Sequence, residues 1–188
     1  MSKRPTSAPS VPRNLRHLRL FLAVAETGSV TDAAARCHVT QPAVTQALAK
    51  LELAIGATLF ERTRQGFFAT PQGVILAERI RRALARLDPA LSDIAPRLTL
   101  TASLAQLQAL VALRETENFT LAARRLGLAQ PTVHRAITQL EQEAGRILFE
   151  RTAFGMIASR QAKTLAQAMR LALTELDQAE AELADLNG

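Results

Sequence analysis

The sequence has a single cysteine, Cys37, and no long apolar run. A lone cysteine cannot form an intramolecular disulfide, which indicates a reducing compartment. A membrane-spanning helix needs about 18 or more consecutive apolar residues, and no such stretch occurs. Residues 1–12 lack the apolar core that a signal peptide or a membrane anchor needs. We therefore expect a cytoplasmic protein that does not enter a membrane.

Patterns typical of catalysis and metal binding are also missing. His17, His38 and His134 are scattered, and the sequence has neither a His-x-x-x-His nor a Cys-x-x-Cys spacing. A glycine-rich phosphate-binding loop is absent as well. We expect no enzymatic activity, no metal site and no cofactor.

Basic residues outnumber acidic ones by 23 to 17, and the excess is unevenly distributed. Residues 1–14 contain basic but no acidic side chains, whereas residues 175–188 contain acidic but no basic ones. We predict that residues 1–14 form a flexible basic arm. The basic excess of the arm and the central part of the chain favours a polyanionic partner, with a merely solvated surface as the alternative.

The chain is an internal duplication. Residues 15–88 match residues 104–177 at a constant offset of 89, with about 31 of 74 aligned positions identical and no gap. The offset places residues 40–52, TQPAVTQALAKLE, on residues 129–141, AQPTVHRAITQLE. Such a repeat predicts two domains of the same fold, which we place at residues 15–95 and 96–188.

In the first copy, apolar residues at helical spacing predict a helix from Leu15 that ends before Gly28. Thr31 is expected to open a short alanine-rich helix. Thr40 is a good N-cap for a third helix, and Pro42 fits the first turn of that helix. The inner face of the third helix is apolar, so its outward face holds Gln41, Thr45, Gln46 and Lys50. Small residues that allow close crossing, followed by an exposed polar face, predict a helix-turn-helix.

Residues 58–63 and 67–70 favour β-structure around a glycine and predict a two-stranded wing. A longer helix should follow over residues 72–87 and end before Pro89. The equivalent helix of the second copy, over residues 161–186, has a heptad-like apolar stripe that predicts dimerisation through Leu165, Met169, Leu173, Leu176 and Leu183. The expected fold is mainly α: two tandem winged helix-turn-helix domains, each with a small two-stranded β wing and a long linker helix.

Both copies resemble the amino-terminal winged helix-turn-helix domain of LysR-type transcriptional regulators. The resemblance rests on the alanine pair, the third helix that begins with Gln-Pro and closes with Leu-Glu, and the Leu-Phe-Glu-Arg-Thr that precedes the wing. It covers residues 15–88 and 104–186. It implies a sequence-specific transcriptional regulator that binds a double-stranded DNA operator at the nucleoid of a bacterial cell, as a homodimer through its linker helices.

Two features depart from the family. A typical member has one such domain followed by a linker helix and a large ligand-binding domain, whereas here a second copy stands in that place. We therefore expect the chain to be a fragment that lacks a carboxyl-terminal effector-binding domain. Two questions stay open: the linker helices can pair within one chain or between chains, and the second copy can be a protein-interaction or dimerisation module that does not bind DNA.

The outward-facing residues of the third helix in each copy are the candidates for base contacts. An amide near a helix amino terminus can form paired hydrogen bonds with adenine, and an arginine can do so with guanine. The alternative for each residue is an exposed polar helix position, or a helix starter in the case of proline. The predicted base-contacting residues are Gln41, Pro42, Thr45, Gln46, Gln130, Pro131, His134 and Arg135.

A second set is predicted to contact phosphate or the minor groove. For Thr31 and Thr120, helix capping is the alternative role. For Arg62 and Arg151, the alternative is an ion pair with a nearby glutamate. In the second copy Ala129 replaces Thr40, which removes a capping hydroxyl worth on the order of 1 kcal/mol. The full predicted set is Thr31, Thr40, Lys50, Arg62, Arg64, Thr120 and Arg151.

Overall fold

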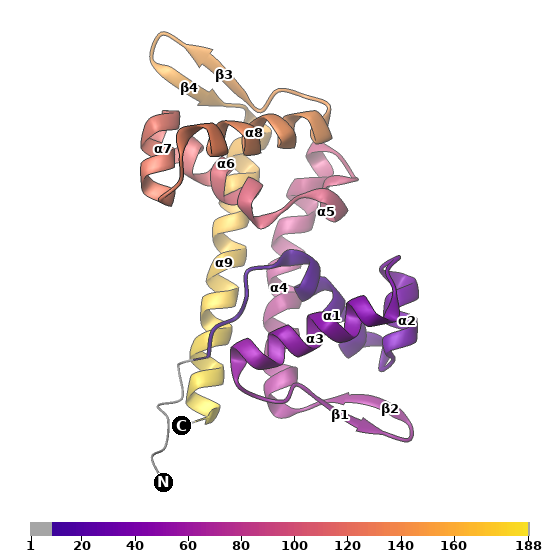
Figure 1. The fold of residues 1–188 in the computed structure, drawn as a ribbon. Coiled ribbons are helices and arrows are strands. Elements are labelled where there is room, and N and C mark those ends of the chain that lie inside the picture. Colours follow the sequence, from indigo (N-terminus) through magenta and orange to yellow (C-terminus); the bar gives the residue numbers. More distant parts are fainter. Residues whose placement is uncertain (1–8, 188) are drawn as a thin grey trace. The chain divides into compact units, whose positions relative to one another are not determined.

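The computed structural model describes residues 9–187, which divide into two compact units. Leu84–Leu173 form unit 2, and the described residues on either side of this segment form unit 1. Within each unit three helices are followed by a two-stranded hairpin (Figure 1). The predicted fold class, mainly α with two small β wings, is confirmed.

Unit 1 contains helices α1 (Leu15–Thr27), α2 (Val30–Arg36) and α3 (Gln41–Ile55), followed by strands β1 (Phe60–Thr63) and β2 (Gly66–Ala69). Asn14 caps α1, Ser29 caps α2 and Thr40 caps α3 through their side chains. The inner face of α3 is buried as predicted, with Val44, Ala47, Leu48 and Leu51 in the core. This burial leaves the opposite face of α3 open to solvent.

Unit 2 repeats this arrangement after the short helix α5 (Leu98–Thr101). It contains α6 (Leu104–Thr116), α7 (Phe119–Leu126), α8 (Gln130–Ala144), β3 (Phe149–Thr152) and β4 (Gly155–Ala158). The two wings have the same antiparallel register, since Phe60 pairs with Ala69 and Phe149 with Ala158. The duplication in sequence is therefore also a duplication of backbone structure.

Each wing is bound to the turn between the first two helices of its copy. The Phe67 backbone N–H donates to the Gly28 carbonyl at 2.9 Å, and that of Met156 donates to the Glu117 carbonyl at 2.8 Å. Gly66 and Gly155 make this approach possible, because a Cβ at either position would lie 2.6 Å from the same carbonyl oxygen. The base of each wing is thus fixed relative to its helix-turn-helix.

The first linker helix, α4 (Pro71–Ile94), is longer than predicted. The sequence predicted an end before Pro89, but Pro89 lies inside the helix at an exposed position. An interior proline costs about 3 kcal/mol. Burial of Leu91 and Ile94, each worth about 1.5–3 kcal/mol, can offset that cost. Tertiary packing therefore overrides the local stop signal.

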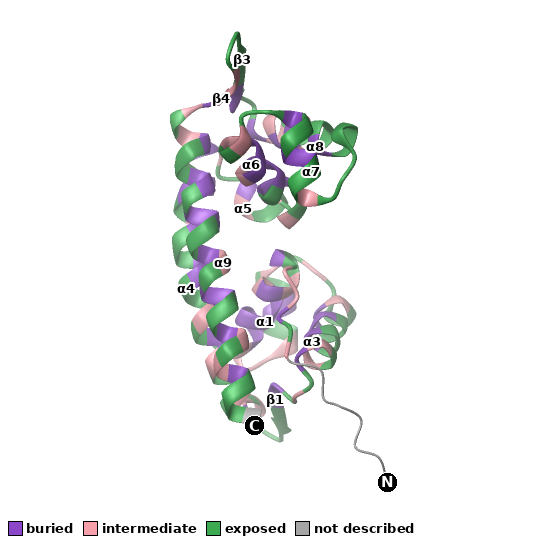
Figure 2. Cartoon of the chain, turned by 90° about the vertical axis from the view of Figure 1, so that its left-hand side faces the viewer, coloured by how far each residue is buried: buried purple, intermediate pink, exposed green. Residues whose placement is uncertain are grey.

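The second linker helix is α9 (Arg160–Asn187), and each unit combines parts of both linker helices. Unit 1 contains the first half of α4 and the last part of α9. Unit 2 contains the second half of α4 and the first part of α9. The predicted domains, residues 15–95 and 96–188, each keep one linker helix whole, so the division into two units differs from them. The domain boundary between residues 95 and 96 stays a prediction. Buried and exposed residues alternate along both helices (Figure 2).

The residues predicted to mediate dimerisation lie on the inner face of α9. Leu173 is half-buried. The other four are buried within the single chain: Leu165, Met169, Leu176 and Leu183. Their role in dimerisation stays a prediction.

The predicted flexible arm lies partly outside the described residues, which begin at residue 9. Its last residues differ from the expectation because they pack within unit 1. Val11 is buried, and its backbone N–H donates to the Glu180 carboxylate at 2.7 Å. Arg13 forms ion pairs with Asp177 and with Glu180. Burial and charge pairing hold residues 11–14 in place.

Across residues 9–187, no helix combines the length and the apolarity that crossing a lipid bilayer would require.

Among residues 9–187, two non-glycine residues adopt left-handed backbone conformations, and each has a glycine at the equivalent position of the other copy. His38 has φ 54° and aligns with Gly127, whereas Glu117 has φ 54° and aligns with Gly28. A side chain in this conformation costs on the order of 1 kcal/mol. We expect His38→Gly and Glu117→Gly each to raise the free energy of unfolding by up to about 1 kcal/mol, measured by urea denaturation.

The reverse changes, Gly127→His and Gly28→Glu, serve as matched controls and should lower the free energy of unfolding. A loss of stability in both glycine variants would show that contacts of the His38 and Glu117 side chains outweigh the backbone strain.

Candidate DNA-binding surfaces

The outward face of α3 presents the polar residues that the sequence predicted. Gln41, Thr45, Gln46 and Lys50 are all exposed, as is Pro42. The Thr40 hydroxyl caps the helix by accepting from the Ala43 N–H at 3.4 Å. The Thr45 hydroxyl donates to the Gln41 carbonyl at 3.2 Å, so its lone pairs stay available to a further donor. The face therefore offers amide, hydroxyl and ammonium groups over two helical turns.

A groove in unit 1 joins the start of α3 to the wing. Thr31, Gln41 and Thr45 lie on the helix side, and Arg62 and Arg64 lie on the wing side. The Arg62 guanidinium lies 5.8 Å from the centre of the Phe67 ring. Hydroxyl and amide groups therefore face arginines across one concave surface. Such a surface fits a polyanion whose edges carry hydrogen-bonding groups.

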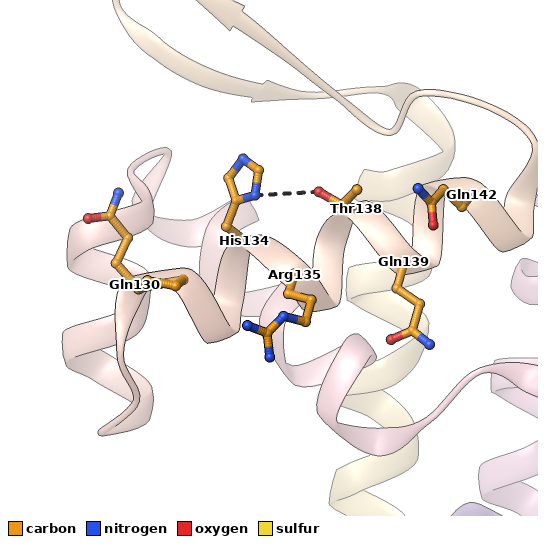
Figure 3. Close-up of a pocket in the computed structure, with 7 residues that line it drawn as sticks. Gln130, His134, Arg135, Thr138, Gln139 and Gln142 are labelled. Carbon is orange, nitrogen blue, oxygen red and sulfur yellow. Dashed lines mark hydrogen bonds between the residues drawn. The ribbon is translucent and has the colours of Figure 1, made fainter.

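The corresponding helix of the second copy, α8, lines a shallow pocket with its outer face (Figure 3). Gln130, His134 and Arg135 occupy the positions of Gln41, Thr45 and Gln46, and all three are exposed. The pocket continues along the helix past Thr138 and Gln139 to Gln142. This face has a guanidinium at its centre, whereas the face of α3 has an amide there.

Two side chains of the α8 surface are held by neighbours in unit 2. The His134 ring packs against Phe119 at 5.0 Å between centroids, and its Nδ1 lies 3.5 Å from the Thr138 hydroxyl. The Thr120 hydroxyl donates to the Gln130 side-chain oxygen at 3.4 Å. Among residues 9–187 no hydrogen bond holds the Gln41 side chain, so a ligand would meet a more ordered amide at Gln130 than at Gln41.

The wing arginines do not form the ion pairs that were the alternative reading. Within the described chain, no carboxylate lies within ion-pair distance of Arg62, Arg64 or Arg151. The glutamates considered as partners were Glu61 or Glu52 for Arg62 and Glu150 or Glu141 for Arg151. Of these, Glu52 accepts the Leu59 N–H at 2.8 Å, and Glu141 accepts the Leu148 N–H at 2.8 Å. The exposed wing arginines therefore keep their charge available to an anion.

The capping role considered for Thr31 and Thr120 is wrong. Ser29 caps α2 by accepting the Asp32 N–H, and Asn118 caps α7 by accepting the Leu121 N–H. Both threonines are exposed in the first turn of their helices. Ser29 and Asn118 were not among the predicted caps, although a short polar side chain directly before each helix is the ordinary signal for a cap. Ala129 provides no side-chain cap to α8, as expected.

Among residues 9–187, histidine, cysteine and carboxylate side chains form no cluster suited to a metal ion.

Comparisons with known proteins identify similar chains. The HTH-type transcriptional regulator GalR of Pseudomonas putida is 37% identical over 178 residues, which are 93% of this chain and 45% of that protein. The transcriptional activator protein LysR of Escherichia coli is 45% identical over 75 residues, 40% of this chain and 24% of that protein. The chain thus spans less than half the length of these relatives.

A solved structure also resembles part of the chain. The crystal structure of a CbnR_DBD–DNA complex matches with 41% sequence identity and a TM-score of 0.37, covering 38% of this chain and 82% of that one. The family model described as "Bacterial regulatory helix-turn-helix protein, lysR family" matches residues 15–74 and again residues 104–163. These two segments make up more than half of the chain, and the chain therefore belongs to the LysR family of bacterial regulatory helix-turn-helix proteins.

Proposed function

We propose that this chain is a sequence-specific transcriptional regulator that binds double-stranded DNA through both of its helix-turn-helix copies. The observation that carries the proposal is the repeated outward face of α3 and α8, exposed in each copy beside a wing with an unpaired arginine. The relatives support it, since they are named as transcriptional regulators. A regulator of this kind would act at the nucleoid of the bacterial cytoplasm, by binding rather than by catalysis.

In the proposed complex α3 and α8 each enter a major groove. Gln41 and Gln130, in the first turn of their helices, would pair with adenine through both polar atoms of the amide. Thr45 and Gln46, and His134 and Arg135, would lie about one turn further along the base edges. Pro42 and Pro131 would add methylene contacts to thymine methyl groups. These contacts would supply sequence specificity.

The remaining predicted residues would position the protein on the DNA backbone. Arg62, Arg64 and Arg151 would extend from the wings to phosphates or the minor groove, and Lys50 to a phosphate beside α3. Thr31 and Thr40 would donate hydroxyl hydrogen bonds to phosphates, and Thr120 would do so on releasing its bond to the Gln130 side chain. Such contacts add affinity on any DNA sequence and depend strongly on salt.

The difference between Gln46 and Arg135 provides a test of base contact by the second copy. Arg135→Gln reproduces the first copy at this position. If Arg135 pairs with guanine, the variant should lose on the order of 1–3 kcal/mol at one base pair of one half-site, measured by binding to a set of single-base variants. Gln46→Arg is the matched control and should create a guanine preference in the other half-site.

Uniform weakening on every DNA sequence would assign Arg135 to phosphate instead. An unchanged affinity and an unchanged base preference would remove Arg135 from the interface altogether.

A second candidate function concerns the second copy alone. Its helix-turn-helix and wing expose Leu121, Leu128 and Phe154, which have exposed fractions of 46%, 48% and 92%. Asp32, Val39 and Gln65 hold the equivalent positions of the first copy, which exposes Leu53 and Phe68 elsewhere on its helix-turn-helix and wing. Exposed apolar residues favour contact with another protein. In this alternative the second copy is an interaction module and only the first binds DNA.

Salt dependence separates the two candidate functions. Each neutralised phosphate contributes a slope of about −0.9 to the dependence of log K on log salt. Comparing the chain with its Lys50→Ala and Arg151→Ala variants assigns phosphate contacts to each copy, because each lost contact should reduce the slope by about 1. An unchanged slope for Arg151→Ala and a reduced one for Lys50→Ala would favour the interaction module.

A further inference from the structure

The two linker helices are equivalent elements of the duplication, yet they pair with each other inside one chain. In unit 1, Arg79 of α4 contacts residues in the last part of α9. In unit 2, the Gln161 side chain at the start of α9 donates to the Asp93 carbonyl near the end of α4 at 3.1 Å. An early part of one helix meets a late part of the other in both units, so the pairing is antiparallel.

Arg79 is the most heavily bonded side chain of this pairing. Its guanidinium forms an ion pair with Glu175 at 2.8 Å, and the two side chains are only 15% and 11% exposed. It also donates to Gln178 and forms an ion pair with Glu182. These hydrogen bonds raise the pKa of Arg79 and lower the pKa of Glu182. One α4 side chain therefore meets three polar side chains on successive turns of α9.

The duplication shows which alternative pairings this contact disfavours. Glu175 aligns with Arg86, Glu182 with Asp93, and Arg79 with Ala168. If α4 paired in the same geometry with α4 of another chain, Arg79 would face Arg86 at the buried position of Glu175, and only Asp93 would remain as a carboxylate. If α9 paired with a second α9, Glu175 would face Ala168 instead of Arg79. Only the pairing of α4 with α9, the unlike pair, places a carboxylate opposite Arg79 at the positions of both Glu175 and Glu182.

A second contact has the same asymmetry. Arg13, just before α1, forms ion pairs with Asp177 and Glu180 of α9. The residue equivalent to Arg13 in the second copy is Ala102, and the residue of α4 equivalent to Glu180 is the buried Leu91. The residue of α4 equivalent to Asp177 is Asp88, so α4 of another chain would offer Arg13 one carboxylate where α9 offers two.

We propose that the linker helices pair within one polypeptide, and that Arg79 and Glu175 select the unlike pair over pairing with a second copy of the chain. One chain then carries both halves of an interaction that otherwise needs two subunits. The inference is independent of the proposed function, because it concerns helix pairing and not DNA binding.

Cross-linking between isotope-labelled chains tests the proposal directly. Arg79→Lys places an amine beside Glu175 and Glu182, and a carbodiimide can join it to either carboxylate as an amide. Labelled and unlabelled chains of this variant are unfolded together, refolded as a mixture, cross-linked and digested. Mass spectrometry should find the α4–α9 link only between peptides of the same label. The parent chain is the control, because its guanidinium forms no such amide.

Links between labelled and unlabelled peptides would overturn the proposal, and absence of the link would overturn the contact on which it stands. Exchanging the charges of Arg79 and Glu175 tests whether they select the pairing of α4 with α9. Arg79→Glu should lower the midpoint of thermal unfolding, and Arg79→Glu combined with Glu175→Arg should recover most of the loss. Arg64→Glu, at an exposed wing position, is the control and should leave the midpoint unchanged. A double variant no more stable than Arg79→Glu would contradict charge selection.

Discussion

Replacing Gln41 and Thr45 together by alanine is expected to abolish most of the preference of the protein for its specific DNA site. Each good base contact is worth on the order of 1–3 kcal/mol, so the loss for two contacts is on the order of 2–6 kcal/mol. Both side chains are exposed, and neither supports the core of unit 1. The affinity for random duplex DNA should therefore stay nearly the same, since phosphate contacts supply it. Fluorescence anisotropy with specific and random duplexes at one fixed salt concentration measures both quantities.

The control for this variant is Gln65→Ala, an exposed wing residue that was not predicted to contact bases. An equal loss of affinity on specific and random DNA in the double variant would contradict base contact by α3. Circular dichroism confirms that the helices are intact before binding is compared.

The second large effect concerns stability. Gly73 lies in the first turns of α4, where an added Cβ would be 2.1 Å from the Leu59 carbonyl oxygen. That carbonyl already accepts the Thr70 N–H at 3.0 Å, and the Leu59 N–H is bound to Glu52. The loop cannot retreat without breaking these bonds. We expect Gly73→Ala to lower the free energy of unfolding by about 1–3 kcal/mol or more, measured by urea denaturation.

The second copy supplies the matched comparison, because the equivalent residue is Ala162, which is completely buried. Ala162→Gly should cost about 1–2 kcal/mol, from the lost buried methyl group and the greater freedom of glycine in a helix. Gly56→Ala has open space around the new Cβ and tests backbone strain alone, since φ there is +74°. A neutral effect of Gly73→Ala would show that the first copy can relax to the spacing of the second.

Much of the fold follows from local signals in the sequence. The constant offset of the repeat, the apolar face of α3 and the glycine after α1 predict three helices and a wing in each copy, and the structure contains them. The exposed positions of Gln41 and Arg135 were also predictable, because helical periodicity alone separates the inner face from the outer one. The roles of these residues on DNA stay predictions.

Apart from the caps Ser29 and Asn118, whose signal is local, the features that were not predicted depend on distant parts of the chain. The helix continues through Pro89, and Leu91 and Ile94 beyond it are buried, which local propensity does not reveal. Glu117 adopts a left-handed conformation because the wing bonds to its carbonyl. The sequence left the pairing of the linker helices open, because the partners of Arg79 lie about 100 residues away.

The central claim is that both helix-turn-helix copies contact DNA, and footprinting with hydroxyl radicals on a selected binding site tests it most directly. DNA sequences bound by the chain are first enriched from a random pool, and the protected sugars are then mapped on both strands. We predict two protected segments on each strand, one of which disappears with Gln41→Ala and Thr45→Ala and the other with Gln130→Ala and Arg135→Ala. A single protected segment that responds only to changes in α3 would contradict the claim.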